Sequence, residues 1–416
     1  MLGRPVQGAH RSTAQSGVMS ASQVLIAGGG IGGLAAALGC ARAGCEVRLY
    51  ERAPAFSEVG AGVQLGPNVT GILRDWGLGD ELQAVAAFPD QLQARSALTG
   101  EVLGQLPLGA RSIERYGAPY VTVHRADLHR ALARAAMRDE RIHVNLNQPV
   151  TDFSDAAGAV TLTIGATYRV EGDVLVAADG VWSPIRQALI KDGPPRVTGH
   201  LAYRAMLRTA DLPPSLRANQ VTAWLGPHVH VVQYPVRHGE WTNVVAIVEG
   251  APPSDAHDWD HGANQADLMR SLGRVCAPLQ ELLEAAPGAS LNAATWRLWA
   301  LADRPPLRGA DQMARGLVAL AGDAAHPMRP FLAQGAGMAI EDATELGRAM
   351  AMDAVDVPTR LKRYALARWE RCARVQARSA RNGQIFHSTG LMRLGRDALM
   401  RVMGARLMDV PWLYGR

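Results

Sequence analysis

The chain has 416 residues, 48% of them hydrophobic and 19% charged, with a formal net charge of +5. This length predicts two packed regions, and no apolar stretch reaches the ~20 residues of a membrane-spanning helix. Because no basic block is interleaved with aromatic residues, nucleic acid is excluded as an expected partner. The four cysteines lack C-x-x-C spacing, so we expect neither a disulfide scaffold nor a bound metal, and a cytoplasmic location.

Residues 1–22 come first and contain Arg, Ser and Gln but no acidic residue. A transit peptide has this composition. We instead expect a disordered N-terminal extension, with Met19 as an alternative start.

A glycine-rich turn follows, in the stretch VLIAGGGIGG at 24–33. The apolar run before the glycines predicts a buried parallel strand, and a helix ending at Gly44 is expected after them. Gly28, Gly30 and Gly33 match G-x-G-x-x-G. The first permits a tight turn, the second lets a pyrophosphate approach the backbone, and the third lets helix and strand pack closely.

The next strand, EVRLYE, ends at Glu51, 18 residues after Gly33. An acid at this place accepts the ribose hydroxyls of an adenosine, and it argues against an NADP 2′-phosphate here. The turn and the acid together predict a bound dinucleotide.

Two later strands also end in a glycine and an acid. DVLVAADGVWSPIR, at 173–186, reaches Asp179, and the stretch from Gly316 to Ala343 reaches Asp323 before a helix that opens near Gly335. Since ligands sit at the carboxyl ends of strands in such folds, we expect all three strand ends at one sheet edge. There Asp323 accepts from a ribityl hydroxyl, and N–H groups near Gly335 and Ala336 face an electron-rich ring.

A strand-rich segment lies between these stretches and includes HVHVVQYPV at 228–236. Alternation places His230 and Tyr234 on one face, roughly 13 Å apart at about 3.3 Å per residue. A phenol over that face would give its proton to His230, whose unperturbed pKa is about 6.5. On these residues alone, a solvated sheet surface is an equal alternative.

The glycine turn with its Glu, the Asp-Gly strand and the GDAAHP loop, in this order, resemble the single-component FAD-dependent aromatic hydroxylases, or group A flavoprotein monooxygenases. The resemblance covers roughly residues 23–345. It implies an α/β fold like that of p-hydroxybenzoate hydroxylase: a Rossmann-like FAD-binding domain interwoven with a β-sheet substrate domain, plus a helical C-terminal tail. It also implies bound FAD, NADH or NADPH as co-substrate, O₂, and hydroxylation through a flavin C4a-hydroperoxide.

The resemblance carries over to particular residues. The implied cofactor-binding residues are Gly28, Gly30 and Gly33 at the pyrophosphate, Glu51 at the ribose, Arg52 and Val150 at the adenine, Gly62 and Val63 along the ribityl and flavin, Arg125 at the phosphates, and Asp179, Asp323, Pro327, Gly335 and Ala336. His326, beside Pro327, is expected to shape its loop rather than act as a base.

The implied catalytic residues are His230 and Tyr234. The 3-hydroxybenzoate 6-hydroxylase and 6-hydroxynicotinate 3-monooxygenase branches carry a His and, four residues later, a Tyr on a similar strand. Pro330 and Phe331 depart from the polar residues of those branches, and imply a more apolar wall. The expected substrate is a small hydroxylated benzoate or pyridine carboxylate, with Arg204, Arg237 and Arg329 as candidates for its carboxylate. The alternatives are another flavin oxidoreductase or a non-catalytic FAD-binding protein of the same fold.

The tail after position 350 is predicted to be helical. A helix over 357–383 ends near Asn382, with an apolar stripe that suits core packing or a homodimer surface. The Met-rich stretch 391–408 is expected to dock on the FAD domain, with a membrane surface as the alternative. The expected domains are an extension at 1–22, an FAD-binding domain at 23–90, 115–195 and 300–350, a substrate domain at 91–114 and 196–299, and C-terminal helices at 351–416.

Overall fold

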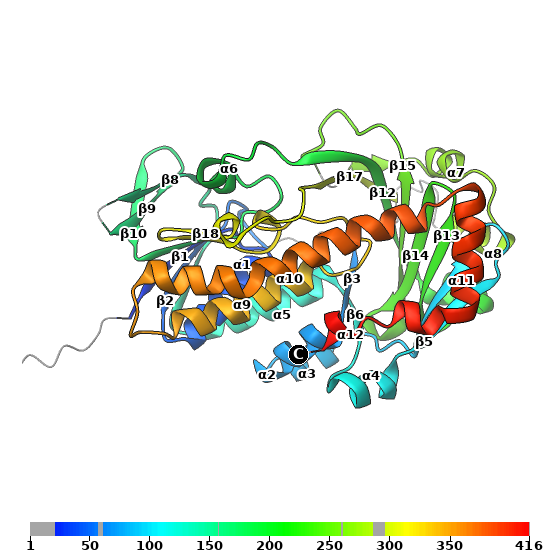
Figure 1. Ribbon diagram of the computed structural model, residues 1–416, viewed down its shortest axis with the longest axis horizontal. Coiled ribbons are helices and arrows are strands. Elements are labelled where there is room, and N and C mark those ends of the chain that lie inside the picture. The colour runs from blue at the N-terminus through cyan, green and yellow to red at the C-terminus, as the bar shows by residue number, and fades with distance from the viewer. Residues whose placement is uncertain (1–20, 57–60, 157, 259–260, 286–295, 416) are drawn as a thin grey trace, which may run out of the picture.

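The computed structural model describes residues 21–56, 61–156, 158–258, 261–285 and 296–415. The expected N-terminal extension lies outside the described residues up to position 20. Two large sheets stand at opposite ends of the long axis, and one long helix reaches from the first to the second (Figure 1).

The first sheet has six strands and forms the dinucleotide-binding half. In spatial order they are β18 (Ala314–Arg315), β19 (Val318–Leu320), β11 (Val174–Ala177), β1 (Gln23–Ala27), β2 (Glu46–Tyr50) and β7 (Ile142–Asn145). All but β18 pair in parallel, and Ala177 is in register with both Ala27 and Leu320. The three predicted strand ends are therefore neighbours at one edge of the sheet.

Helices cover this sheet at close range. α1 (Ile31–Arg42) crosses α9 (Gly335–Met350) where Gly39 faces Gly347. A Cβ on either glycine would overlap the backbone of the other helix, so only glycine allows this approach. α5 (Arg125–Arg138) packs beside α1. The close crossing fixes the start of α9 relative to the glycine turn.

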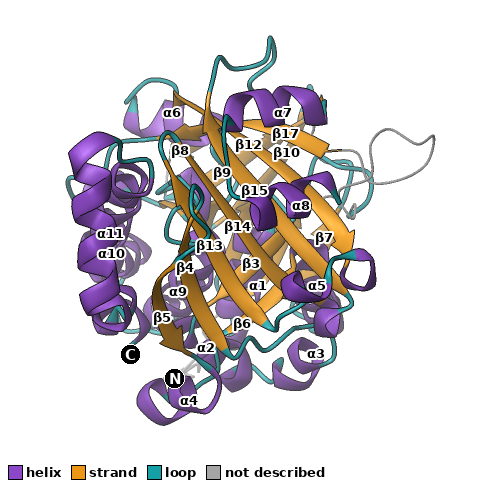
Figure 2. Cartoon of the chain, turned by 90° about the vertical axis from the view of Figure 1, so that its right-hand side faces the viewer, coloured by secondary structure: helices purple, strands orange, loops and turns teal. Residues whose placement is uncertain are grey.

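The second sheet has eight strands. In spatial order they are β16 (His261–Ala263), β17 (Trp296–Asp303), β12 (Arg196–Arg208), β15 (Trp241–Glu249), β14 (Val229–Val236), β13 (Gln220–Gly226), β4 (Gln91–Ser96) and β5 (Val102–Pro107). Only the pair of β13 with β4 is parallel. α7 (Gln265–Leu272) and α8 (Ala277–Glu284) lie over one face (Figure 2). The other face is turned toward the first half.

Smaller elements pack around the two large sheets. They are a three-stranded sheet of β8 (Val150–Ala156), β9 (Ala159–Ile164) and β10 (Tyr168–Gly172), a pair of β3 (Gly62–Leu65) with β6 (Val121–His124), and helices α2 (Pro67–Asp75), α3 (Gly79–Gln83), α4 (Gly109–Tyr116) and α6 (Pro184–Ile190). The predicted fold class, a Rossmann-like α/β region interwoven with a β-sheet region and a helical tail, is confirmed.

The tail consists of α10 (Val357–Phe386), α11 (Gly390–Met408) and α12 (Pro411–Tyr414). The predicted end of α10 near Asn382 is wrong, because Gly383 continues the helix and serves close packing: a Cβ there would overlap the ring of Phe331. Docking of α11 on the FAD domain is also wrong. This helix packs on β5 through Gly104 and Gly404. Within the described ranges, no helix has the length and apolar character to cross a membrane.

Candidate active site

The turn between β1 and α1 leaves space where the sequence predicts a pyrophosphate. Gly28 has φ +102°, and a Cβ on Gly33 would overlap the carbonyl oxygen of Gly28. By contrast, no described atom lies within 4 Å of a Cβ built on Gly30. The first turn of α1 contains no acid, and no side chain caps it. These N–H groups and this open cradle fit a dinucleotide phosphate.

Glu51 holds the turn from the neighbouring strand. Its Oε2 accepts from the Gly29 N–H at 2.6 Å and its Oε1 from the Ala53 N–H at 2.8 Å. Arg52 beside it is exposed. The sequence reasoning missed His129 of α5, whose Nε2 lies 2.7 Å from the Gly29 carbonyl oxygen. The carboxylate is thus fixed beside the cradle.

Asp179 and Asp323 follow the next two strands of the same edge. Neither carboxylate oxygen of Asp179 accepts a well-formed hydrogen bond within the described part of the chain, and burial raises the pKa of this side chain to about 6. Asp323 is exposed, although Gly322 and Ala324 on either side of it are buried. Asp179 and the exposed Asp323 therefore border the edge at which a flavin dinucleotide would lie.

The remaining predicted cofactor residues differ in burial and in the elements that hold them. Gly62 and Val63, on β3, are half-buried, as are Gly335 and Ala336 at the start of α9, where no side chain caps the helix. Pro327 is buried. Arg125 begins α5, and its backbone N–H donates to the Ala61 carbonyl oxygen at 3.0 Å. Val150 lies on the Glu51 side, because the Gln148 N–H donates to the Glu51 carbonyl oxygen at 2.8 Å.

Beneath the GDAAHP loop lies a buried charged network that sequence reasoning missed. His326 Nε2 lies 2.6 Å from Asp342 Oδ2, and Arg368 of α10 binds Asp342 Oδ1 at 2.8 Å and Glu341 at 2.8 Å. Arg371 also binds Glu341, through two nitrogens at 2.6 and 2.7 Å. Although burial opposes it, the Asp342 carboxylate holds the pKa of His326 well above its usual value. His326 thus supports its loop in this ion cluster.

The β14 strand presents His230 and Tyr234 toward the first half of the molecule. Both side chains are buried, at 2% and 4% exposure. Val231, between them, packs in the hydrophobic cluster of the opposite face, together with residues of α7 and α8. The Tyr234 hydroxyl donates to the Gly62 carbonyl oxygen at 2.6 Å, while Asn243 accepts from the Gly62 N–H at 2.7 Å. This face therefore holds β3, which carries two predicted flavin residues.

Between those two side chains the face is more open. Strand register places Val232, Val245 of β15 and Arg204 of β12 in one row across the sheet, between the rows of His230 and Tyr234. Val232 and Val245 are half-buried, as is Met206 of β12 in the Tyr234 row. We call His230, Val232, Tyr234, Val245 and Met206 the β14 patch. It is an apolar surface with a polar group at each end.

His230 has aromatic neighbours and one polar partner. Its ring centroid lies 5.0 Å from that of Phe331 and 5.3 Å from that of Phe386. Its Nδ1 lies 2.7 Å from Nε2 of His387, the residue that follows α10. Burial first, then His387 and His200, lowers the pKa of His230 well below its usual value. His387 was missed, because nothing local in the sequence joins it to β14.

The three arginines proposed for a substrate carboxylate differ in their surroundings. Arg237 binds Asp127 at 2.7 and 3.2 Å, and Arg329 binds Asp303 at 2.7 Å. Arg204 is 5% exposed, on the face of the β14 patch, with its guanidinium 4.7 Å from the Trp299 ring centre. Only Arg204 of the three shares a row with the patch.

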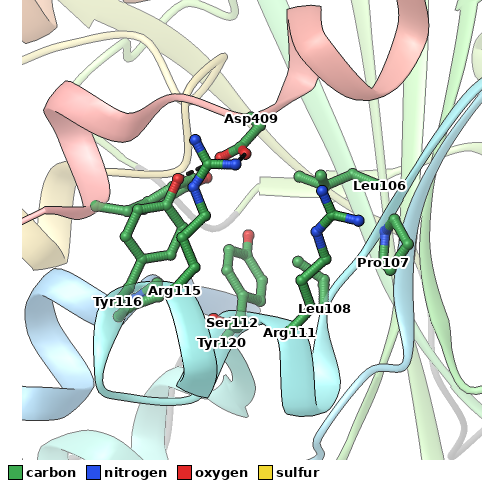
Figure 3. Close-up of a pocket in the computed structure, with 11 residues that line it drawn as sticks. Leu106, Pro107, Leu108, Arg111, Ser112, Arg115, Tyr116, Tyr120 and Asp409 are labelled. Atoms are coloured by element: carbon green, nitrogen blue, oxygen red, sulfur yellow. Dashed lines mark hydrogen bonds and ion pairs between the residues drawn. The ribbon is translucent and has the colours of Figure 1, made fainter.

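A small cavity elsewhere lies between α4 and the chain end (Figure 3). Arg115 and Asp409 form an ion pair of 2.6 Å at its wall, and the Tyr116 hydroxyl also donates to Asp409. None of the predicted site residues lines this cavity.

The open glycine cradle, the acids at three strand ends and the facing β sheet define a flavoprotein of the FAD-dependent hydroxylase class. A family model described as "FAD binding domain" matches residues 21–379, and the chain belongs to that family.

Known relatives narrow the class further. The chain is 36% identical over 395 residues to a 3-hydroxybenzoate 6-hydroxylase of Polaromonas naphthalenivorans, covering 94% of this chain and 95% of that protein. It is 36% identical to a 6-hydroxynicotinate 3-monooxygenase of Bordetella bronchiseptica, covering 85% and 89%. A solved salicylate hydroxylase substrate complex superposes with a TM-score of 0.79 at 27% identity, covering 95% of each chain. The predicted class, an FAD-dependent aromatic-ring monooxygenase, is confirmed.

Proposed function

We propose that this enzyme hydroxylates a small hydroxylated aromatic acid, of the benzoate or pyridine carboxylate type, at the expense of NAD(P)H and O₂, with His230 as the base for the substrate hydroxyl. The β14 patch carries this proposal. It offers half-buried apolar side chains, with a buried imidazole at one end. The relatives that act on hydroxybenzoate and hydroxynicotinate support the same substrate class.

The cofactor-binding roles are proposed on the geometry of the strand ends. The open cradle at Gly30 suits the pyrophosphate, Glu51 the ribose, and Asp323 the ribityl chain. Asp179, whose carboxylate is buried without a well-formed hydrogen bond, faces the same edge. Bound FAD, once reduced by NAD(P)H and exposed to O₂, would supply the electrophilic oxygen.

His230 suits a base because it is neutral and buried. Its lowered pKa keeps the ring unprotonated at neutral pH, so that a nitrogen lone pair is available, and burial favours release of any proton that the ring takes up. Removal of the phenol proton raises the electron density of the ring and favours its attack on an electrophilic oxygen. Burial raises the pKa of Tyr234, whose hydroxyl is committed to the Gly62 carbonyl oxygen. We therefore assign Tyr234 a positioning role: it holds β3 and offers its oxygen lone pair to the substrate.

For the substrate carboxylate we propose Arg204. Arg204 lies on the same sheet face as His230, on β12, two strands away from β14, and in the row of residues next to that of His230. A buried guanidinium retains its charge and gives a carboxylate two parallel hydrogen bonds.

The test is a screen of aromatic acids for stimulated NADH and NADPH oxidation, with the product identified by mass. We expect at least one hydroxybenzoate or hydroxypyridine carboxylate to accelerate oxidation and to gain one oxygen. His230→Ala should still bind FAD and lose hydroxylation by about 100-fold or more, the range for a lost general base. His228→Ala, an exposed histidine near the same strand, is the control and should keep full activity. Normal hydroxylation by His230→Ala would refute the base.

The same screen distinguishes the alternatives. A non-catalytic FAD-binding protein would take up FAD but show no ligand-stimulated oxidation with any acid. A flavin oxidase would consume O₂ and form hydrogen peroxide, without a hydroxylated product.

A further inference from the structure

A buried base must pass its proton on before it can act again. His230 is 2% exposed, and Phe331 and Phe386 shield its ring. Its Nδ1 is committed to His387, so Nε2 is the nitrogen available to a substrate hydroxyl. If the proposed function holds, the proton that leaves the substrate needs a route to water.

The partner ring of His387 is held in place from several sides. Its backbone carbonyl oxygen accepts from the His228 N–H at 3.2 Å, and its own N–H donates to the Gly383 carbonyl oxygen at 3.0 Å. Its Nε2 faces His230 at 2.7 Å. Its other nitrogen, Nδ1, is buried and has no hydrogen-bond partner among the described residues. One side of the ring therefore meets the base, while Nδ1 on the other side is left for a further polar group.

That second group is Glu249, the last residue of β15. Its Oε1 lies 3.9 Å from His387 Nδ1, and its side chain is 50% exposed. Its Oε2 lies 3.0 Å from Nδ1 of the exposed His228. One rotation of this half-exposed side chain, or one bridging water, closes the gap. The chain of groups thus runs from a buried base to solvent.

We propose that His387 and Glu249 form the proton exit of the active site, leading from His230 to water. The substrate O–H bond breaks as its proton joins Nε2 of His230. The Nδ1 proton of His230 passes to Nε2 of His387, and the Nδ1 proton of His387 passes to the Glu249 carboxylate and on to water. One phenol becomes one phenolate, one proton enters solvent, and no electrons are exchanged. The reverse transfers restore both rings when the product is protonated.

The surroundings of the two imidazoles favour transfer of the proton along the path over its retention on either ring. The pKa of His387 is lowered to about 4, mainly by burial and next by His200. His228 and Arg329 also lower this pKa, whereas Glu249 raises it. Arg329 is itself paired with Asp303, and the His200 ring centroid lies 5.3 Å from that of His387. Because neither imidazole retains a charge at neutral pH, the excess proton does not rest on the path.

The test follows the proton directly. Oxidised holoenzyme is mixed rapidly, in weak buffer with a pH indicator, with the phenolic acid that stimulates NADH oxidation most in the screen above. Substrate absorbance reports phenolate formation, and the indicator reports release to water. We expect His387→Gln to slow both about tenfold or more, while FAD content and substrate affinity stay within twofold. Its rate should rise with pH, as hydroxide replaces the path.

Further variants keep the outcome decisive. Glu249→Gln, at a half-exposed position, should slow release about threefold or more, even if His387→Gln fails to fold. Imidazole added to His387→Ala should restore the rate. His228→Gln is the matched control, since it also contacts Glu249 but lies outside the path. Wild-type release rates and pH profile in both His387→Gln and Glu249→Gln would overturn the exit path. If His230→Ala also formed phenolate normally, the base itself would be wrong.

Discussion

The buried ion cluster beneath the GDAAHP loop makes a prediction about stability. Asp342 is fully buried and binds His326 at 2.6 Å, Arg368 at 2.8 Å and the Gly322 N–H at 3.0 Å. Asp342→Asn keeps the size of the side chain but leaves two buried cations short of a partner. Breaking such a pair from one side costs about 3–5 kcal/mol.

This energy translates into a measurable temperature shift. At about 2.1 cal/mol/K per residue, cooperative unfolding of the chain carries an entropy of roughly 0.9 kcal/mol/K. The expected fall in Tm is therefore about 3–6 °C. Glu345→Gln is the control on the same helix. It removes the carboxylate bound by the exposed Arg348, a pair worth roughly 0–1 kcal/mol, and should change Tm by about 1 °C or less.

The pH dependence separates a charge effect from simple packing. The raised pKa of His326 contributes stability that is complete below its unfolded value near 6.5 and is lost as pH rises through the folded value. The lowered pKa of Asp342 contributes above about 3.9 and is lost in acid. The Tm difference between wild type and Asp342→Asn should thus be greatest between about pH 4 and 6.5, and should shrink toward alkaline pH. A difference that is absent, or constant from pH 5 to 9, would refute this reasoning.

Three further variants test the flavin side by thermal unfolding and FAD titration. Gly30→Ala should leave the Tm of the apoprotein unchanged but weaken FAD binding, because its Cβ enters the open space of the cradle. Gly33→Ala should lower both the Tm and the FAD affinity, because its Cβ overlaps Gly28. Equal behaviour of these two variants would contradict the proposal that the cradle at Gly30 holds the pyrophosphate. Tyr234→Phe removes the hydrogen bond from the Tyr234 hydroxyl to Gly62, which is worth about 1 kcal/mol, and should weaken FAD binding about fivefold. Unchanged FAD affinity would show that β3 keeps its position without this hydrogen bond.

Local sequence was enough for the features that depend on neighbouring residues. The glycine spacing requires a particular turn, and alternation places His230 and Tyr234 on one face. His387 and Arg368 were beyond its reach, because the packing of α10 brings them to His230 and to Asp342, across 157 and 26 residues of chain. Gly383 shows that a glycine in a helical sequence has two structural meanings. Glycine commonly ends helices, but here it lets Phe331 pack closely against α10, and the helix continues to Phe386.

The long helix α10 also bears on engineering. Arg368, near the middle of α10, binds the ion cluster, and His387, just past the end of α10, contacts β14. The same helix therefore contacts both halves of the molecule (Figure 1). A chimera that transplants only the eight-stranded sheet from a relative would leave the host's histidine against a foreign strand. Exchange of substrate specificity between such enzymes should therefore move β12–β15 and the last turns of α10 as one cassette.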